Sequence, residues 1–217
     1  MTSDKVVIDV RINEYALRGP NPHVPYSPEE IAARALECRR EGAALIHYHA
    51  RDPVTGAPSV DPAAYADTAR RIKRESDLLI MPTLGAATLW HVGSIRATEA
   101  LVEIGVFEEP VYCEIALLEG GLFAGHPGTV AGLEAFLSCM PGRTGWHWAV
   151  ICFGGSLFPI LRLALERGGH VAIGLGDHPY EELGCPTNAE LVARVVRMAR
   201  EVGREPATPA EARALLL

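Results

Sequence analysis

Short apolar runs alternate along the chain with segments whose apolar residues recur at helical spacing. We expect strands at residues 6–10, 43–49, 78–81, 111–118, 146–153 and 171–175. We expect helices at residues 27–42, 61–72, 96–104, 132–140, 157–166 and 189–202, and a short last helix from residue 208. The strand runs show little polar alternation, which is typical of the buried strands of a parallel sheet with helices outside it.

Capping residues mark the starts of several expected helices. Ser27 precedes Pro28, Glu30 completes a capping box, and Gly42 ends the same helix. The other expected N-caps are Asp61, Asn188 and Thr208.

The repeated strand-then-helix order predicts an α/β fold related to the TIM barrel. A closed barrel of eight units averages roughly 250 residues, about 30 per unit. The chain has 217 residues and six visible units, so we expect a shortened parallel β/α barrel in one domain, residues 1–217. A doubly wound open sheet is the alternative.

Composition narrows the possible partners. The chain carries 20 Lys and Arg against 27 Asp and Glu, a net charge of −7, and no basic run. Nucleic acid and anionic membranes are therefore not expected partners. The five cysteines form no CxxC pair, no apolar run is long enough to span a bilayer, and no secretory segment is recognised, so we expect a cytoplasmic protein with reduced thiols.

The second expected strand ends in a run of histidines. Because side chains alternate along a strand, His47, His49 and Arg51 share one face at the strand end, where ligands bind in such folds. Two imidazoles at this spacing can bind one metal ion, and the arginine could hold an anion. A pair of hydrogen-bonded core histidines fits the same pattern equally well.

The sixth expected strand ends in Gly176, Asp177 and His178. Asp177 is a candidate base, or a group that orients a ligand, although it could equally cap the next turn. His178 is in phase with residues 174 and 176 and is a candidate third metal ligand.

Other strand ends offer weaker candidates for binding. Asn13 and Glu14 follow the first strand, and the Thr83 hydroxyl follows the third. Gly155 and Ser156 precede a helix, where backbone N–H groups can bind an anion. Ordinary loops and turns would explain all of these. No GxGxxG, GxxxxGK[ST] or GxSxG motif is present.

Several blocks of sequence resemble one enzyme family. They are PYSPEEI at 25–31, EGAALIHYHARDP at 41–53, GGHV at 168–171, NAELV at 188–192 and GREPATPAEAR at 203–213. Together they resemble the β-keto acid cleavage enzymes, the family of the 3-keto-5-aminohexanoate cleavage enzyme.

The resemblance implies a TIM barrel, a zinc ion and a homo-oligomer. It also implies a transferase that condenses a β-keto acid with acetyl-CoA and splits the adduct into acetoacetate and a new CoA thioester. The family's zinc histidines fall on His47 and His49, its strand-end aspartate, part of the base machinery, on Asp177, and its hydroxyl residue on Thr83.

The chain departs from the family pattern at several positions. The family's catalytic arginine is Ala172 here, and its zinc-binding glutamate is Gly176. The stretch 152–155 lacks a basic residue that the family pattern has there. The fourth and fifth strand–helix units of the family barrel are expected to be deleted in this chain. A third protein ligand would then be His178, our first choice by strand parity, or Glu14 or Asp177.

Three hypotheses about function follow. The preferred one is a metal-dependent acyl-transfer enzyme of this family, with Asp177, Thr83 and Arg51 as catalytic residues. Asn13, Glu14, Gly155 and Ser156 would then bind substrate. A metal-dependent hydrolase or lyase acting on a keto acid is the second. A non-catalytic relative that binds a small carboxylate is the third, favoured by Ala172 and Gly176.

An open barrel exposes strand edges, so we expect an oligomer that covers the gap between the third and fourth strands.

Overall fold

The structure, a computed structural model, describes residues 4–81, 87–121, 123–142 and 144–216. Its main sheet has seven parallel strands in the order β4-β3-β2-β8-β7-β6-β5. The strands are β2 (Ile8–Arg11), β3 (Leu45–His47), β4 (Leu79–Met81), β5 (Ala87–Leu89), β6 (Val111–Leu118), β7 (Trp146–Phe153) and β8 (His170–Ile173). A separate parallel pair joins β1 (Lys5–Val6) to β9 (Glu205–Pro206).

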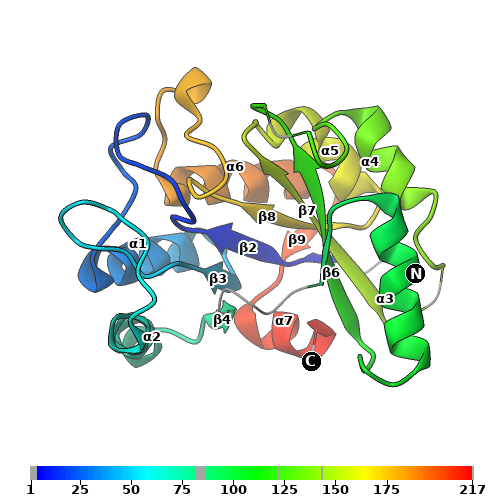
Figure 1. Cartoon of the computed structure of the whole chain (residues 1–217), viewed down its shortest axis with the longest axis horizontal. Helices are drawn as coiled ribbons and strands as arrows, with labels where there is room; N and C mark the ends of the chain where they lie inside the picture. Colours follow the sequence, from blue (N-terminus) through cyan, green and yellow to red (C-terminus); the bar gives the residue numbers. More distant parts are fainter. Residues whose placement is uncertain (1–3, 82–86, 122, 143, 217) are drawn as a thin grey trace.

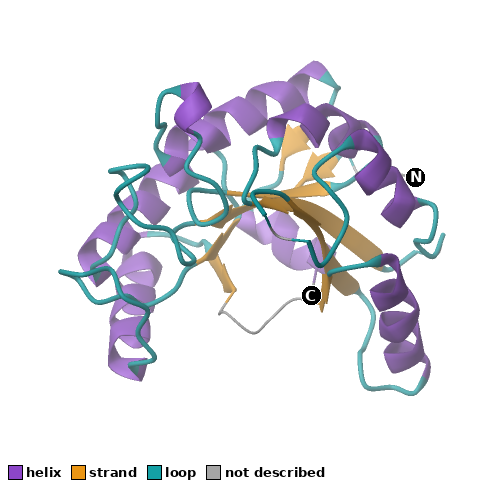
Figure 2. Cartoon of the chain, turned by 45° about the horizontal axis from the view of Figure 1, so that its top comes forward, coloured by secondary structure: helices purple, strands orange, loops and turns teal. Residues whose placement is uncertain are grey.

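The main sheet is a barrel wall that does not close. Strands β4 and β5 follow one another along the chain but form opposite edges of the sheet. Strand β4 lies at its edge next to β3 (Figure 1). The sheet curls like an arch, and most helices lie along its outer side (Figure 2). The predicted class, a shortened TIM-barrel-related α/β fold, is therefore confirmed.

The helices mostly begin and end where their capping residues predict. They are α1 (Pro28–Glu41), α2 (Pro62–Glu75), α3 (Val92–Glu103), α4 (Val130–Leu137), α5 (Phe158–Glu166), α6 (Asn188–Glu201) and α7 (Pro209–Leu216), with a 3₁₀ turn at Glu181–Leu183. The capping box of Ser27 and Glu30 forms, and Gly42 ends α1 with a φ of 117°. Side-chain caps fix the starts of α1, α2, α4 and α6, whereas α3 and α5 begin without one.

Two expectations about the elements are wrong. The fourth strand of the main sheet along the chain is β5, which precedes α3 in a stretch where the sequence predicted no strand. The N-cap of α6 is Thr187, whose side chain accepts from the Glu190 N–H. Asn188 instead ties the sheet to α6: its Oδ1 accepts from the Leu175 N–H and its Nδ2 donates to the Ile12 carbonyl.

The last helix covers the amino end of the curled sheet. A separate apolar cluster joins Ala212 and Leu216 of α7 to Val7, Ala44 and Leu79 of the strand region. The catalytic end of a β/α barrel is the opposite one, where the strands end. None of the helices in the described ranges is both long and apolar enough to cross a membrane.

A buried histidine predicts how stability depends on pH. His170 begins β8, and its Nδ1 accepts from the Val7 N–H at 3.1 Å. Burial, with the charge of Arg204 nearby, lowers the pKa of His170 to about 3. The unfolded chain, with an ordinary histidine pKa near 6.5, takes up this proton first as the pH falls. We expect stability to fall from about pH 6.5 towards pH 3, with about 2 kcal/mol lost by pH 5 from this residue alone.

Urea unfolding at a series of pH values measures this loss. His170→Asn keeps an acceptor for Val7 but cannot take the proton, so its stability should fall less between pH 6.5 and 5 than that of the wild type. The exposed His91 provides the control, and His91→Asn should retain the wild-type slope. Equal slopes for His170→Asn and the wild type would contradict the prediction.

Candidate metal centre and active site

Two imidazoles and a carboxylate meet at the ends of β2 and β3. The Glu14 carboxylate lies 2.9 Å from His47 Nε2 through Oε1 and 2.6 Å from His49 Nε2 through Oε2. The two Nε2 atoms lie 3.1 Å apart. All three ligand atoms fall within 4.8 Å of one another, and the group is buried. Two histidines and one carboxylate are a donor set of catalytic zinc sites, so these residues fit a divalent metal ion.

The sheet and one buried amide fix both histidines. His47 ends β3 opposite Arg11, and its carbonyl accepts from the Ile12 N–H at 3.0 Å. Asn13 holds His49 through two bonds: its Oδ1 accepts from the His49 N–H at 2.9 Å, and its Nδ2 donates to the His49 carbonyl at 3.0 Å. Nδ2 also donates to the Pro25 carbonyl. The Asn13 side chain, predicted to bind substrate, is therefore occupied in positioning His49.

Glu14 is held in an unusual backbone conformation. Its φ is 26°, in the left-handed region that residues with a side chain rarely adopt. Burial alone would raise the pKa of Glu14, but hydrogen bonds from His47 and His49 and the charge of Arg11 hold it well below its usual range. The group is therefore an ionised carboxylate, as a metal ligand must be.

Arg51 stabilises the loop that carries Glu14. Its guanidinium donates to the carbonyls of Gly56 at 2.6 Å, Asn13 at 3.2 Å and Ala16 at 2.7 Å, and also to that of Glu14. The side chain is buried. Its donors therefore point to backbone carbonyls, and the anion contact that the sequence suggested stays a prediction.

Asp177 lies at the end of β8 beside a cavity of about 310 Å³. Among the described residues, neither carboxylate oxygen has a hydrogen-bond partner. Burial raises the pKa of Asp177 well above its usual range, against the charge of Arg11. The Gly154 N–H donates to the Asp177 carbonyl at 2.9 Å, which joins the ends of β7 and β8. The backbone of Asp177 is thus fixed between these two strand ends, and no described residue forms a hydrogen bond with its carboxylate oxygens.

The structure places Glu14, not His178, beside the two histidines. His178 lines the same cavity as Asp177, but its Nε2 lies 3.1 Å from the Glu182 carboxylate. The expectation from strand parity fails here because β8 ends at Ile173, so the alternation of side chains does not extend to residue 178.

The remaining predicted residues lie around this site or outside the described part. Gly155 and Ser156 join β7 to α5, next to Phe153 and Gly154, which line the cavity. A Cβ at Gly155 would come within 2.7 Å of Glu119, so this loop is tightly packed. Thr83 lies outside the described residues.

A buried charge network under the site was not expected from the sequence. Arg11 Nη2 lies 2.7 Å from Glu14, and Nη1 donates to both Glu114 oxygens at 3.0 and 3.3 Å. Asp9 Oδ2 lies 3.8 Å from Arg11. Burial alone would lower the pKa of the guanidinium, but the charges of Glu114, Asp177, Asp9 and Glu14 raise it above its usual range. Glu114 thereby gains the partner that a carboxylate inside a buried strand requires.

A signal for this network does exist in the sequence. Arg11 and Asp9 interrupt the apolar run 6–12, and all of these positions are buried. A charged residue in a buried strand needs a partner of opposite charge. The pattern cannot say which residue provides it, because Arg11 and Glu114 are 103 positions apart.

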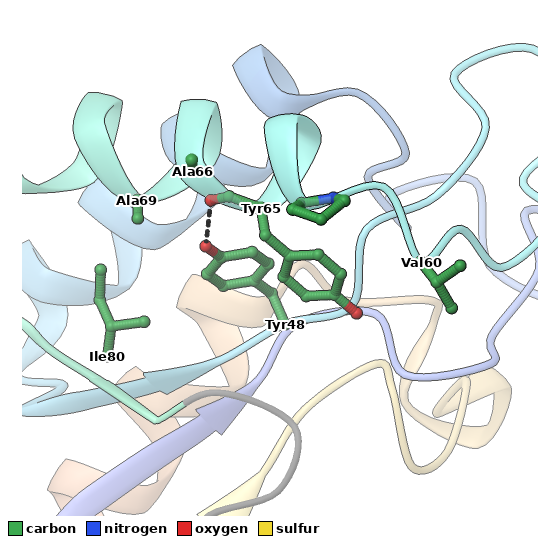
Figure 3. A pocket seen from close by; sticks show the side chains of 7 residues that line it. Tyr48, Val60, Tyr65, Ala66, Ala69 and Ile80 are labelled. Carbon is green, nitrogen blue, oxygen red and sulfur yellow. Dashed lines mark hydrogen bonds between the residues drawn. The ribbon is translucent and has the colours of Figure 1, made fainter.

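A second hollow, on the outer side of the sheet, has a different character. An apolar groove of about 600 Å³ lies between α2 and the edge strand β4, lined by Tyr48, Val60, Pro62, Tyr65, Ala66, Ala69 and Ile80 (Figure 3). The Tyr48 hydroxyl donates to the Tyr65 carbonyl at 2.8 Å (Figure 3). No acid, histidine or cysteine is among these seven residues, and the tyrosines Tyr48 and Tyr65 are their only titratable groups.

Comparison with known proteins assigns the family. The model of the beta-keto acid cleavage enzymes matches residues 5–92 and 86–217. The chain belongs to the β-keto acid cleavage enzyme family. As the sequence predicted, it is an enzyme of the β-keto acid cleavage type and a shortened member of that family.

Two curated relatives show how the chain is shortened. It is 30% identical to the 3-keto-5-aminohexanoate cleavage enzyme of Fusobacterium nucleatum over 251 residues, which cover 90% of this chain and 91% of the relative. It is 24% identical to the 3-oxoadipate:acetyl-CoA acetyltransferase of Cupriavidus necator, with 90% and 88% covered. The aligned span of 251 positions exceeds the 217 residues of the chain, so the chain lacks residues that the first relative has. The two segments that match the family model overlap at residues 86–92, next to the opening between β4 and β5.

A solved structure supports the fold. The apo structure of ObcA superposes with a TM-score of 0.69 at 12% identity, covering 90% of this chain. The chain spans 65% of the length of that protein. At this identity the likeness concerns the fold alone.

Proposed function

We propose that this chain binds one zinc ion through His47, His49 and Glu14 and uses it to cleave a β-keto acid with acetyl-CoA. The observation that carries the proposal is the buried group of three ligands at the strand ends, next to the cavity that Asp177 lines. In the overall reaction, the keto acyl group passes to CoA, and the carboxymethyl part of the substrate joins the acetyl group to form acetoacetate. The products are acetoacetate and a new CoA thioester.

Each residue near the cavity has a defined part in this proposal. A bound zinc would act as a Lewis acid and polarise the keto group of the substrate. Asp177 would accept or return a proton during bond formation and cleavage, because its two oxygens have no hydrogen-bond partner in the part of the chain that the structure describes. Asn13 and Arg51 would keep His49 and Glu14 in place. Thr83 stays a predicted catalytic residue, and Gly155 and Ser156 stay predicted contacts of the substrate.

The residues that line the cavity limit the charge that the far end of the substrate can carry. Its lining residues are Glu14, Tyr15, Ala16, Leu17, Pro20, Val24, Phe153, Gly154, Leu175, Gly176, Asp177, His178 and Pro179, and no lysine or arginine is among them. A second carboxylate on the substrate would therefore meet no basic side chain from this set. This supports a β-keto acid whose far end is neutral or cationic over one with two carboxylates.

The alternative of a non-catalytic relative has less support. It rests on Ala172 and Gly176, which lack the cation and the carboxylate of the family pattern. The interior nevertheless holds a cation, Arg11, and Glu14 brings a carboxylate to the histidines. The charges are present at other positions of the chain, so the loss at residues 172 and 176 is no argument against catalysis.

Metal content tests the proposal directly. We expect about one zinc per chain in protein purified without chelator, and none in His47→Ala/His49→Ala. His178→Ala is the matched control, since this histidine lies outside the ligand group, and it should keep its metal. The zinc-loaded protein should convert 3-keto-5-aminohexanoate and acetyl-CoA to acetoacetate and a CoA thioester, detected by mass spectrometry.

The controls separate two kinds of failure. Absence of bound metal in the wild type, even with zinc added, would overturn the proposed centre. Bound metal without turnover of any β-keto acid would favour the non-catalytic relative. A homo-oligomer and a cytoplasmic location stay predictions from the sequence.

A further inference from the structure

The glycine at position 176 leaves the space that Glu14 occupies. A Cβ built on Gly176 would lie 2.5 Å from Glu14 Cγ, 2.9 Å from Glu14 Cβ and 2.9 Å from the Glu14 backbone nitrogen. Contacts under 3.0 Å essentially never occur for real Cβ atoms. Any side chain at residue 176 must therefore displace Glu14.

Glu14 has little freedom to move away from such a side chain. Its carbonyl accepts from Arg51, its carboxylate is fixed by Arg11 and both histidines, and its φ of 26° is already unfavourable. By contrast, the backbone at Gly176 is not in the left-handed region, so its conformation alone does not require glycine. The requirement for glycine here comes from the neighbouring Glu14.

We propose that Gly176 is a positioning residue for the metal centre: residues 14 and 176 share one space beside His47 and His49, and only one of them can fill it with a carboxylate. In this chain Glu14 fills it from the end of β2, and the missing side chain at the end of β8 makes this possible. The inference rests on the proposed metal centre and names a residue that does not itself touch the metal.

The test compares the effect of Gly176→Glu on zinc affinity in two backgrounds, where we expect opposite directions. In the wild-type background, Gly176→Glu should weaken zinc binding about tenfold or more, because the new side chain displaces Glu14. In a Glu14→Gly background, which has lost its carboxylate and the strained φ, the same Gly176→Glu substitution should strengthen zinc binding about tenfold. Affinity is measured by competition with a chromogenic chelator, and Co²⁺ absorption reports whether the ligand set is restored.

Folding is checked on the same proteins by thermal melting of the metal-free forms. If Gly176→Glu alone does not fold, Gly176→Ala replaces it: this variant should weaken zinc binding when Glu14 is present and leave it unchanged when residue 14 is glycine. Gly19→Ala is the control for a glycine with open space around it in the same loop region. It should bind zinc like the wild type.

Distinct results identify what has failed. The proposal about Gly176 is overturned if Gly176→Glu changes affinity in the same direction in both backgrounds, or if Gly176→Ala binds zinc like the wild type. The metal centre itself fails if His47→Ala/His49→Ala binds zinc as tightly as the wild type. The first result leaves the proposed function intact.

Discussion

Arg11→Met is expected to destabilise the protein by about 3–5 kcal/mol, the range for breaking a buried ion pair from one side. The guanidinium bridges Glu14 and Glu114 in the interior of the curled sheet. The carboxylates of Asp9 and Asp177 also interact with its charge. Methionine fills much of the same volume but leaves these carboxylates without the cation. The fold must then keep unpaired charges buried or take up protons, and both are costly.

Removing one carboxylate at the same time should recover part of this loss. In Arg11→Met/Glu114→Gln, one buried charge disappears along with its partner, so the double variant should be more stable than Arg11→Met alone. Arg162→Met is the surface control: its partners Glu166 and Glu201 are exposed, and the change should stay within about 0.5 kcal/mol. Urea unfolding at pH 7 gives all these free energies. A loss below about 1 kcal/mol for Arg11→Met would show that the network does not hold the interior together.

Arg51→Met should weaken both the fold and the metal centre. Four backbone carbonyls lose a donor, those of Gly56, Asn13, Glu14 and Ala16, although the Asn13 carbonyl keeps the Ala16 N–H. Leaving buried acceptors unsatisfied costs about 1–3 kcal/mol for each lost partner, so we expect a loss of about 3 kcal/mol in total after relaxation. Zinc affinity should fall about tenfold, in line with other residues that hold a ligand in place.

The same variant decides between two roles of Arg51. If Arg51 bound the substrate carboxylate, as the sequence suggested, Arg51→Met would raise KM while stability and zinc affinity stayed unchanged. Arg51→Lys is informative as well, because one ammonium group cannot reach four carbonyls in the planar arrangement of a guanidinium. We expect Arg51→Lys to lose most of the stability that Arg51→Met loses. Unfolding free energies and chelator competition on both variants measure these effects.

Local patterns predicted the candidate site only in part. The His47 and His49 pair is readable from strand alternation, and the position of Asp177 from its place after a strand, because both depend on residues close together in sequence. Glu14 was named as a possible third ligand but ranked below His178. The choice between them depends on where β8 ends and on the backbone turn at Glu14, which strand parity does not describe.

The sequence by itself determined the order of the helices and of the strands other than β5, the helix ends set by Ser27, Gly42 and Asp61, and the shortened barrel class. Hydrophobic periodicity and capping are local properties and can be read from residues close together in sequence. The tertiary structure alone decided the pairing of Arg11 with Glu114 and the hydrogen bonds from Arg51 to backbone carbonyls. It also decided the close contact of Glu14 with Gly176. These contacts join residues as far as 162 positions apart. They exist because curling the parallel sheet brings distant strands together around one interior, where each buried charge needs a partner and each side chain needs its own space.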